Sequence, residues 1–323
     1  MLTATACSPG ENGDSPGDDA APETAPTQSV DEVAEPGRHT LHSATVDGLD
    51  RTWSVYSPES DVADIGPMPI MLVIHGTGDT GSGIRSGIGA DLERHAEADG
   101  FIIAYVDGYE NNWNECRTEG DWAAKEMELD DVELMREVVE GIHTDLGSDA
   151  VDTERVFALG FSSGGHMALR LAMEAPDLVA GVAPVAANLP APENQSCDDS
   201  GEPMPVIFVQ GREDAINPFE GGDVRVGSGP FGESRGEVLS AAESADWFAE
   251  RNNAGQADGE PVTERDGDAE VTTWSGENPV RLVAVDDSGH SFPTESGRWV
   301  NHGGARYDGP GAIWQFLAES TGD

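Results

Sequence analysis

Three residue types that together support nucleophilic catalysis occur in this sequence in the order serine, aspartate, histidine. Ser162 stands at the centre of Gly-Phe-Ser-Ser-Gly, a G-x-S-x-G pattern that lies between an apolar run and a helix-like segment. That arrangement is typical of a nucleophile elbow, in which glycines allow a tight turn beneath an exposed serine. The alternative is a glycine-rich turn that holds serines by coincidence.

A serine nucleophile needs a base and an acid that orients the base. Asp214 follows the apolar run Val-Ile-Phe-Val-Gln-Gly, and His290 follows Val-Arg-Leu-Val-Ala-Val, so both are expected just beyond a strand end. Their order after the serine is the one found with such elbows. Glu213 is the nearest competitor for the acid, whereas Asp286 and Asp287 belong to the strand that delivers the histidine.

The glycine-rich run Gly-Thr-Gly-Asp-Thr-Gly-Ser-Gly at 76–83 follows an early apolar run. It predicts an oxyanion hole made by the backbone N–H groups of Thr77 and Ser163, where each such donor is worth ~10²- to 10³-fold in turnover. A phosphate-cradling loop is the alternative. The run lacks both the Lys-Ser/Thr of a P-loop and the G-x-G-x-x-G spacing, so nucleotide binding is not expected.

Positioning these side chains requires strands that end at one edge of a sheet. Six apolar runs are continuous, as in parallel strands buried on both faces, and two earlier runs alternate as an antiparallel pair. Amphipathic helical segments separate them, which predicts an α/β fold: a three-layer sandwich with a mostly parallel sheet of about eight strands and an antiparallel N-terminal pair. Strands are expected at 39–48, 51–58, 69–76, 100–108, 155–162, 178–187, 205–211 and 280–289, and helices at 88–98, 131–146, 165–174, 239–252 and 312–319.

The composition is strongly acidic. In 323 residues, 62 acidic side chains oppose 17 basic ones for a formal net charge of −45, and residues 39–323 alone hold 54 acidic and 16 basic residues. Nucleic acid is therefore excluded as a partner, because too few cations are present to neutralise phosphates. Self-repulsion of this size is relieved by salt, so we interpret the acidity as adaptation to a salty medium. A solvated acidic surface that serves solubility alone is the alternative.

The N-terminal segment resembles the end of a lipoprotein signal. Small residues lead to Cys7, and residues 1–7 are expected to be the remnant of such a signal, although a basic region and a full apolar core are missing before the cysteine. Residues 8–38 are rich in Pro, Gly, Ser and acids and predict a disordered linker. Residues 39–323 are expected to form one catalytic domain. We expect an extracellular or cell-surface protein, with a lipid on Cys7 as its only membrane attachment; an incidental cysteine is the alternative.

The other two cysteines, Cys116 and Cys197, are a candidate disulfide in an exported protein. Trp113 and Phe292 lie in loops near the expected sheet edge, either as an apolar platform for the substrate or in ordinary loop packing. His75 and His166 flank the catalytic loops and are expected to be structural. No cluster of cysteine, histidine and acidic residues has metal-site spacing, so neither a metal nor a cofactor is expected.

Several motifs are spread over most of the domain: NNWNEC, Asp130-Asp131-Val132, GFSSGGHMA, QGREDAINPFEGG, VLSAAESADWFAERN, SGHSFP and IWQFLAE. Together, they resemble the α/β-hydrolase esterases grouped as polyhydroxybutyrate depolymerase-like and as feruloyl and acetylxylan esterases of carbohydrate esterase family 1. The resemblance implies Ser162, Asp214 and His290 as the triad. The sequence departs from the family at Gln210, Asn217 and Ser291-Phe292-Pro293, and the last change touches the pocket wall.

The expected function is therefore a serine esterase, a carboxylic ester hydrolase that works through an acyl-enzyme. Polyesters of the polyhydroxybutyrate type or short-chain esters are the expected substrates. Release of feruloyl or acetyl groups from plant polysaccharide is the alternative. A more distant alternative is a non-catalytic surface lipoprotein that binds a ligand in the same pocket.

Overall fold

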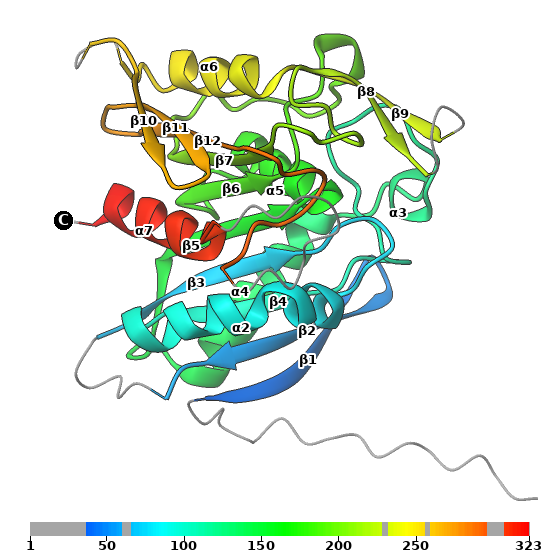
Figure 1. Ribbon diagram of the computed structural model, residues 1–323. Coiled ribbons are helices and arrows are strands. Elements are labelled where there is room, and N and C mark those ends of the chain that lie inside the picture. The colour runs from blue at the N-terminus through cyan, green and yellow to red at the C-terminus, as the bar shows by residue number, and fades with distance from the viewer. Residues whose placement is uncertain (1–36, 60–65, 228–231, 256–258, 296–306, 323) are drawn as a thin grey trace, which may run out of the picture. The chain divides into compact units, whose positions relative to one another are not determined.

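One ten-stranded sheet crosses the part of the chain that the computed structural model describes, residues 37–59, 66–227, 232–255, 259–295 and 307–322 (Figure 1). From one edge to the other its strands are β1 (Arg38–Val46), β2 (Leu49–Ser57), β4 (Ile102–Val106), β3 (Met68–Ile74), β5 (Val151–Phe161), β6 (Gly181–Val185), β7 (Val206–Gly211), β12 (Val280–Val285), β11 (Ala269–Trp274) and β10 (Val262–Asp266).

The middle of this sheet is parallel and its edges are antiparallel. Strands β4, β3, β5, β6, β7 and β12 pair in parallel, whereas β1, β2, β10 and β11 pair antiparallel with their neighbours. Every residue of β3 and β4 is buried, which is why both are continuous apolar runs in the sequence. The predicted parallel sheet with an antiparallel N-terminal pair is confirmed.

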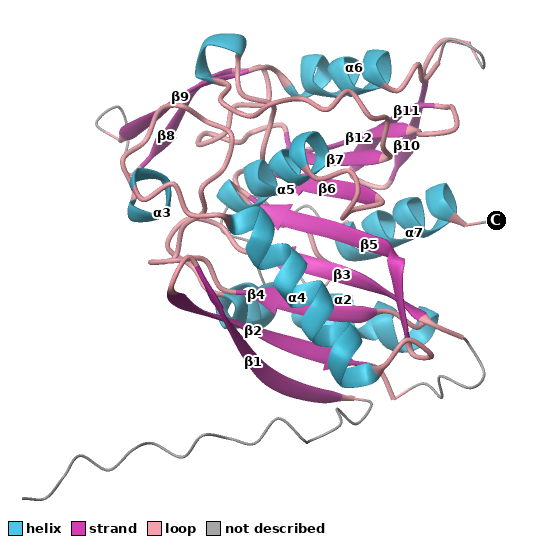
Figure 2. Cartoon of the chain, turned by 180° about the vertical axis from the view of Figure 1, so that it is seen from behind, coloured by secondary structure: helices cyan, strands magenta, loops and turns pink. Residues whose placement is uncertain are grey.

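Helices cover both faces of the sheet and complete the three predicted layers. Helices α2 and α7 lie on the face seen in Figure 1, where Ile84, Ile88 and Ile313 are buried in one apolar core. Helices α4, α5 and α6 share the other core, and Figure 2 shows α4 and α5 on that opposite face. The bounds are α2 (Gly81–Asp99), α4 (Asp131–Leu146), α5 (Ser163–Glu174), α6 (Ala241–Arg251) and α7 (Gly309–Thr321).

The sheet has ten strands rather than about eight, because β10 and β11 extend it beyond β12. Every residue of β10 is exposed and its sequence is Val-Thr-Glu-Arg-Asp, so it carries no hydrophobic pattern. A separate hairpin was also not predicted; it consists of β8 (Gly222–Val226) and β9 (Glu233–Val238). The same holds for two short elements, α3 (Ala123–Glu126) and a 3₁₀ turn at Pro192–Asn194.

The N-terminal predictions fall outside the described residues. Contacts divide the chain into two units, Met1–Glu32 and Val33–Asp323, and only the second contains described residues. The lipidation of Cys7, the signal remnant at 1–7 and most of the linker at 8–38 therefore stay predictions. Among the helices of the described segments, none combines the length and the apolarity that crossing a membrane requires.

Candidate active site

Ser162 occupies the turn between β5 and α5 in a backbone conformation that is rare for a residue with a side chain. Its φ is 55° and its ψ is −119°. Neighbouring glycines make the turn possible: a Cβ atom on Gly160 would lie 1.9 Å from the carbonyl oxygen of Gly164, and one on Gly164 would lie 2.1 Å from that of Ile74. The G-x-S-x-G pattern is therefore a strained strand-to-helix elbow.

Asp214 and His290 follow the neighbouring parallel strands β7 and β12 and meet beside that elbow. His290 Nε2 lies 3.0 Å from Ser162 Oγ, and His290 Nδ1 lies 2.8 Å from Asp214 Oδ2. The two loops approach closely because Gly211 lacks a side chain; a Cβ there would lie 2.4 Å from the carbonyl oxygen of Ser288. The structure thus brings the three predicted catalytic residues together in one chain of hydrogen bonds.

The second carboxylate oxygen of Asp214 is held by the backbone. Its Oδ1 accepts hydrogen bonds from the N–H groups of Ile216 at 2.8 Å and Asn217 at 2.9 Å, and its side chain has no exposed surface. Glu213, the competing acid, is exposed, and Asp286 forms ion pairs with two arginines away from the histidine. The geometry selects Asp214 as the partner of the imidazole.

The backbone donors predicted for the oxyanion hole border the elbow. A Cβ on Gly76 would lie 3.3 Å from Ser162 Cβ, which places the start of the glycine-rich loop against the serine. Thr77 follows and is exposed, while Ser163 is the first residue of α5. Amides in the first turn of a helix have no partner within the helix, and neither of these two amides donates to another described residue. Both are free to bind an oxyanion.

Trp113 supports this loop instead of forming the expected substrate platform. It has no exposed surface, and its indole N–H donates to the carbonyl oxygen of His75 at 2.8 Å. Gly78 N–H donates to the carbonyl oxygen of Asn111, so two hydrogen bonds join these loops. His75 accepts from Gly108 N–H through Nε2, and burial lowers its pKa. The structural role expected for His75 agrees with these contacts, and the platform prediction for Trp113 is wrong.

Phe292 also differs from the prediction. Its side chain is 1% exposed and belongs to the apolar core beneath the histidine loop, with its ring centroid 6.4 Å from that of Phe161. An aromatic ring that is closed off from solvent on all sides cannot present a face to an entering ester. Sequence spacing located both aromatic residues near the sheet edge, but it carried no information about which way the rings point.

His166 lies one helical turn after Ser162 and is almost fully buried. Burial, together with the positive charge of Arg117, holds the pKa of its imidazole well below the usual value. Its Nδ1 has no hydrogen-bond partner among the described residues. A neutral, buried imidazole therefore lies in the first turn of the helix that follows the nucleophile.

Three segments cover the carboxyl edge of the sheet, and we call them the cap: residues 113–122, residues 188–197 and the β8–β9 hairpin. The Cys116–Cys197 disulfide joins the first two, which confirms the predicted pair. The side-chain amide of Asn194 donates to the carbonyl oxygens of Arg235 and Glu237 and so joins the second segment to the hairpin. The cap is therefore cross-linked covalently and by hydrogen bonds.

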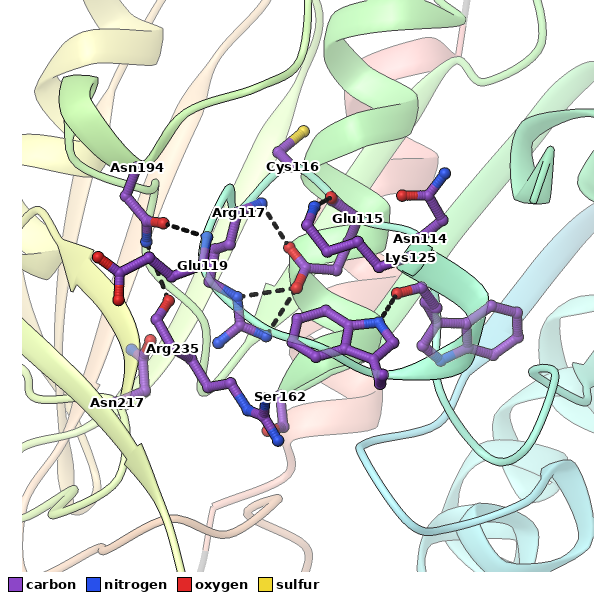
Figure 3. A network of polar contacts seen from close by, with 12 residues as sticks. Asn114, Glu115, Cys116, Arg117, Glu119, Lys125, Ser162, Asn194, Asn217 and Arg235 are labelled. Atoms are coloured by element: carbon purple, nitrogen blue, oxygen red, sulfur yellow. Dashed lines mark hydrogen bonds and ion pairs between the residues drawn. The ribbon is translucent and has the colours of Figure 1, made fainter. Parts of the chain in front are cut away.

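The cap contains a cluster of cations around one indole ring (Figure 3). The Trp122 ring centroid lies 4.8 Å from the Arg235 guanidinium carbon, 5.7 Å from that of Arg117 and 5.9 Å from Lys125 Nζ. Arg117 also forms a buried ion pair with Glu115 at 2.8 Å. This cluster was not predicted from the sequence. One signal for it was present, since Lys125 is the only lysine in the chain.

A parallel sheet with a serine elbow, followed in chain order by an aspartate and a histidine on later strand ends, defines an α/β-hydrolase. No family model matches the sequence. The putative esterase NocK of Nocardia uniformis subsp. tsuyamanensis is 30% identical over 274 residues, which cover 79% of this chain and 74% of that protein. The chain therefore belongs to the α/β-hydrolase esterases, and it is a carboxylic ester hydrolase of the serine type.

Two further proteins resemble the chain. Feruloyl esterase B of Piromyces equi is 27% identical over 136 residues, which span 42% of this chain and 24% of that protein. An acetyl xylan esterase from Aspergillus awamori superposes with a TM-score of 0.53 at 16% identity, over 80% of this chain and 96% of that structure, and supports the fold alone. All of these relatives are esterases, so the non-catalytic lipoprotein considered from the sequence is not supported.

Proposed function

We propose that Ser162 is the nucleophile of this esterase, His290 its general base and Asp214 the acid that orients the base. One observation carries the proposal: the hydrogen-bond chain from Ser162 Oγ through both nitrogens of His290 to Asp214 Oδ2, at 3.0 Å and 2.8 Å. His290 Nδ1–H donates to the carboxylate, which leaves Nε2 free to accept a proton from the serine.

Acylation begins when Ser162 Oγ attacks the ester carbonyl carbon and its proton passes to His290 Nε2. Asp214 stabilises the imidazolium that forms, and the negative oxygen of the tetrahedral intermediate is bound by the N–H groups of Thr77 and Ser163. The intermediate collapses with loss of the alcohol, which takes the proton from His290. Water then attacks the acyl-enzyme by the same route in reverse and releases the acid.

We propose short-chain esters or polyesters of the polyhydroxybutyrate type as substrates, as the family motifs suggest. Esters of plant polysaccharide are the second candidate. The partial match to a feruloyl esterase favours that candidate. Trp113 and Phe292, the two aromatic residues considered as substrate contacts, are buried and therefore do not favour either candidate.

A substrate panel separates these candidates. Para-nitrophenyl esters of several lengths, methyl ferulate, acetylated xylan and a polyhydroxybutyrate suspension are compared with the wild type and with Ser162→Ala. We expect the variant to fold normally and to lose on the order of 10⁶-fold in kcat. Ser86→Ala on the exposed side of α2 is the matched control and keeps full activity. Substantial ester hydrolysis by Ser162→Ala would exclude the proposed nucleophile.

We further propose that the protein is exported, attached through a lipid on Cys7 and adapted to salt. A disulfide suits an oxidising compartment, and a net charge of −45 is best screened at high ionic strength. Lipid labelling of the wild type and Cys7→Ser in a host that processes lipoproteins tests the anchor, which predicts label on the wild type alone. Activity and Tm should both rise from 0.1 M to about 1 M NaCl, where the Debye length falls from ~10 Å to ~3 Å. Maximum activity without added salt would contradict the adaptation.

A further inference from the structure

The cation cluster around Trp122 is unusual for this composition. Only 17 residues of the chain are lysine or arginine, against 62 acidic residues, yet three of the 17 surround a single indole in the cap. Cations above an aromatic face are attracted by its quadrupole, but they repel one another. Such a group is expected to be matched by negative charge, and of the three carboxylates paired with these cations only Glu115 is buried.

Two of the three cations contact Glu115. Arg117 is neutralised by Glu115, because both side chains are buried and their charged atoms lie 2.8 Å apart. Lys125 Nζ donates to the backbone carbonyl oxygen of Glu115 at 3.3 Å and has no ion pair with a described acidic residue. Its half-buried amine thus adds positive charge without a carboxylate of its own, and burial lowers its pKa.

Arg235 is the cation with donors to spare. Its side chain is 10% exposed, and its Nη2 donates to Glu233 at 3.0 Å, while Nη1 lies 3.5 Å from an oxygen of Asp121. Both acids extend into water, with side chains 74% and 86% exposed, so their interaction with the guanidinium is weak. Neither Nε nor Nη1 makes a hydrogen bond to a described residue, and Nη2 carries a second N–H besides the one given to Glu233, so one edge of the guanidinium still offers two parallel donors.

The guanidinium of Arg235 is aimed at the reaction centre. Figure 3 shows the side chain extending from its strand toward Ser162. Its guanidinium carbon lies over the Trp122 ring. The backbone of Arg235 is held in place by the Asn194 amide, and Asn194 belongs to the segment that the disulfide joins to residues 113–122. An arginine stacked on an aromatic ring and fixed at both ends is preorganised for a planar anion.

We propose that Arg235, stacked on Trp122, binds a carboxylate carried by the ester substrate, so that anionic esters are preferred over neutral ones of the same length. The planar guanidinium presents two parallel N–H groups that match the two oxygens of a carboxylate. The inference rests on the proposed function, since it concerns substrate choice by the same serine. The anion belongs either to the acyl part or to the alcohol part of the ester.

Matched substrates test this preference at one fixed salt concentration. Mono-para-nitrophenyl adipate is compared with para-nitrophenyl hexanoate for the acyl part, and para-(butyryloxy)benzoate with para-(butyryloxy)benzamide for the alcohol part. Arg235→Gln should lower kcat/KM for the anionic ester of one pair by about 10- to 100-fold, the range expected for hydrogen bonds to a charged group. Hydrolysis of the neutral esters should stay within about twofold.

Two further variants separate recognition from folding. Arg225→Gln changes an arginine on the other strand of the same hairpin, paired with Asp223, and should leave both ratios unchanged. Arg235→Lys keeps the charge but loses the fork, and should give an intermediate loss on the anionic ester alone. Equal losses on anionic and neutral esters, or no loss on either anionic ester, would overturn the proposal. Failure of the wild type on every ester of both pairs, anionic and neutral alike, would instead overturn the proposed function.

Discussion

Asp214 and His290 stand 76 positions apart in the chain and are joined by a 2.8 Å hydrogen bond between Oδ2 and Nδ1. Their strands β7 and β12 are hydrogen-bonded neighbours, with Gly211 paired to Val285, so both loops begin at the same height of the sheet. The N–H groups of two residues after the aspartate fix its other oxygen. The orientation of the imidazole is therefore built from backbone geometry and depends on a single carboxylate.

Asp214→Asn is predicted to fold normally and to lose about 10⁴-fold in kcat. The amide would donate to Nδ1 and hold the imidazole in the tautomer that carries its proton on Nε2, which cannot accept the serine proton. Steady-state hydrolysis of a para-nitrophenyl ester measures the loss. Glu213→Gln alters the exposed neighbouring carboxylate in the same way and should change kcat less than twofold. A larger effect at Glu213 than at Asp214 would reverse their assignment.

Backbone donors at the oxyanion hole predict opposite outcomes for two substitutions. Ser163→Ala keeps the N–H group and removes a hydroxyl that is buried without a described partner, so kcat should fall by less than about threefold. Thr77→Pro removes one N–H donor and should cost ~10²- to 10³-fold. Thr77→Ala, which keeps the donor, is the control for the lost side chain. Comparable activity of the proline and alanine variants would exclude Thr77 as a donor.

The parts of the fold that could be predicted are those where burial is written into the sequence. Strands β3 and β4 are buried on both faces and appear as unbroken apolar runs, and α4 has the predicted bounds Asp131–Leu146. Strand β10 is exposed at every position, so its pairing depends on backbone hydrogen bonds that leave no residue pattern. The hairpin of β8 and β9 was missed for the same reason, since most of its residues are polar and only partly buried.

The candidate site divides in a similar way. The triad was predictable because each member follows a recognisable strand, and strand ends gather at one edge of a parallel sheet. The direction of the side chains was not predictable, as the buried rings of Trp113 and Phe292 demonstrate. The position of Arg235 depends on a hairpin that the sequence did not reveal and on its contact with Trp122, more than a hundred residues earlier. No local pattern encodes a contact of that kind.

The buried ion pair of Arg51 and Asp131 is predicted to matter for stability. Arg51 Nη2 donates to Asp131 Oδ1 at 2.7 Å, and both side chains are almost inaccessible. Arg51→Met should lower the free energy of unfolding by about 3–5 kcal/mol, because it leaves an uncompensated carboxylate in the core. Urea titration measures the change. Arg136→Met breaks the exposed pair with Asp177 and should cost about 0–1 kcal/mol. Similar costs for the two variants would contradict the prediction.

The disulfide should stabilise the native chain chiefly by restricting the unfolded one. Cys116 and Cys197 are separated by 81 positions, for which loop entropy gives about 4.5 kcal/mol. The free energy of unfolding of the Cys116→Ser/Cys197→Ser double variant should be lower by that amount, so the variant should unfold at a lower urea concentration. Its stability should not respond to reductant, whereas reduction of the wild type should reproduce its loss. If reductant destabilises the double variant as well, the effect has another origin.

The neutral imidazole of His166 predicts a loss of stability in acid. Burial and the neighbouring Arg117 cation hold its pKa well below 6.5 in the folded protein, whereas the unfolded chain has the ordinary value. Below pH 6.5 the unfolded state therefore binds a proton that the folded state does not, so this group adds stability above pH 6.5 that is lost as the pH falls.

The slope from this single proton is at most about 1.4 kcal/mol per pH unit, and His166→Gln should remove it. Urea titrations at pH values from about 7.5 to about 5 compare the variant with the wild type. This range extends at least about one unit on either side of the pKa of a histidine in the unfolded chain. His143→Gln on α4 changes a histidine that is only partly buried and serves as the control. The difference in free energy between wild type and His166→Gln should shift in favour of the variant as the pH falls. A constant difference across the range would mean that the imidazole takes up a proton equally well in both states, contrary to its enclosure behind the elbow.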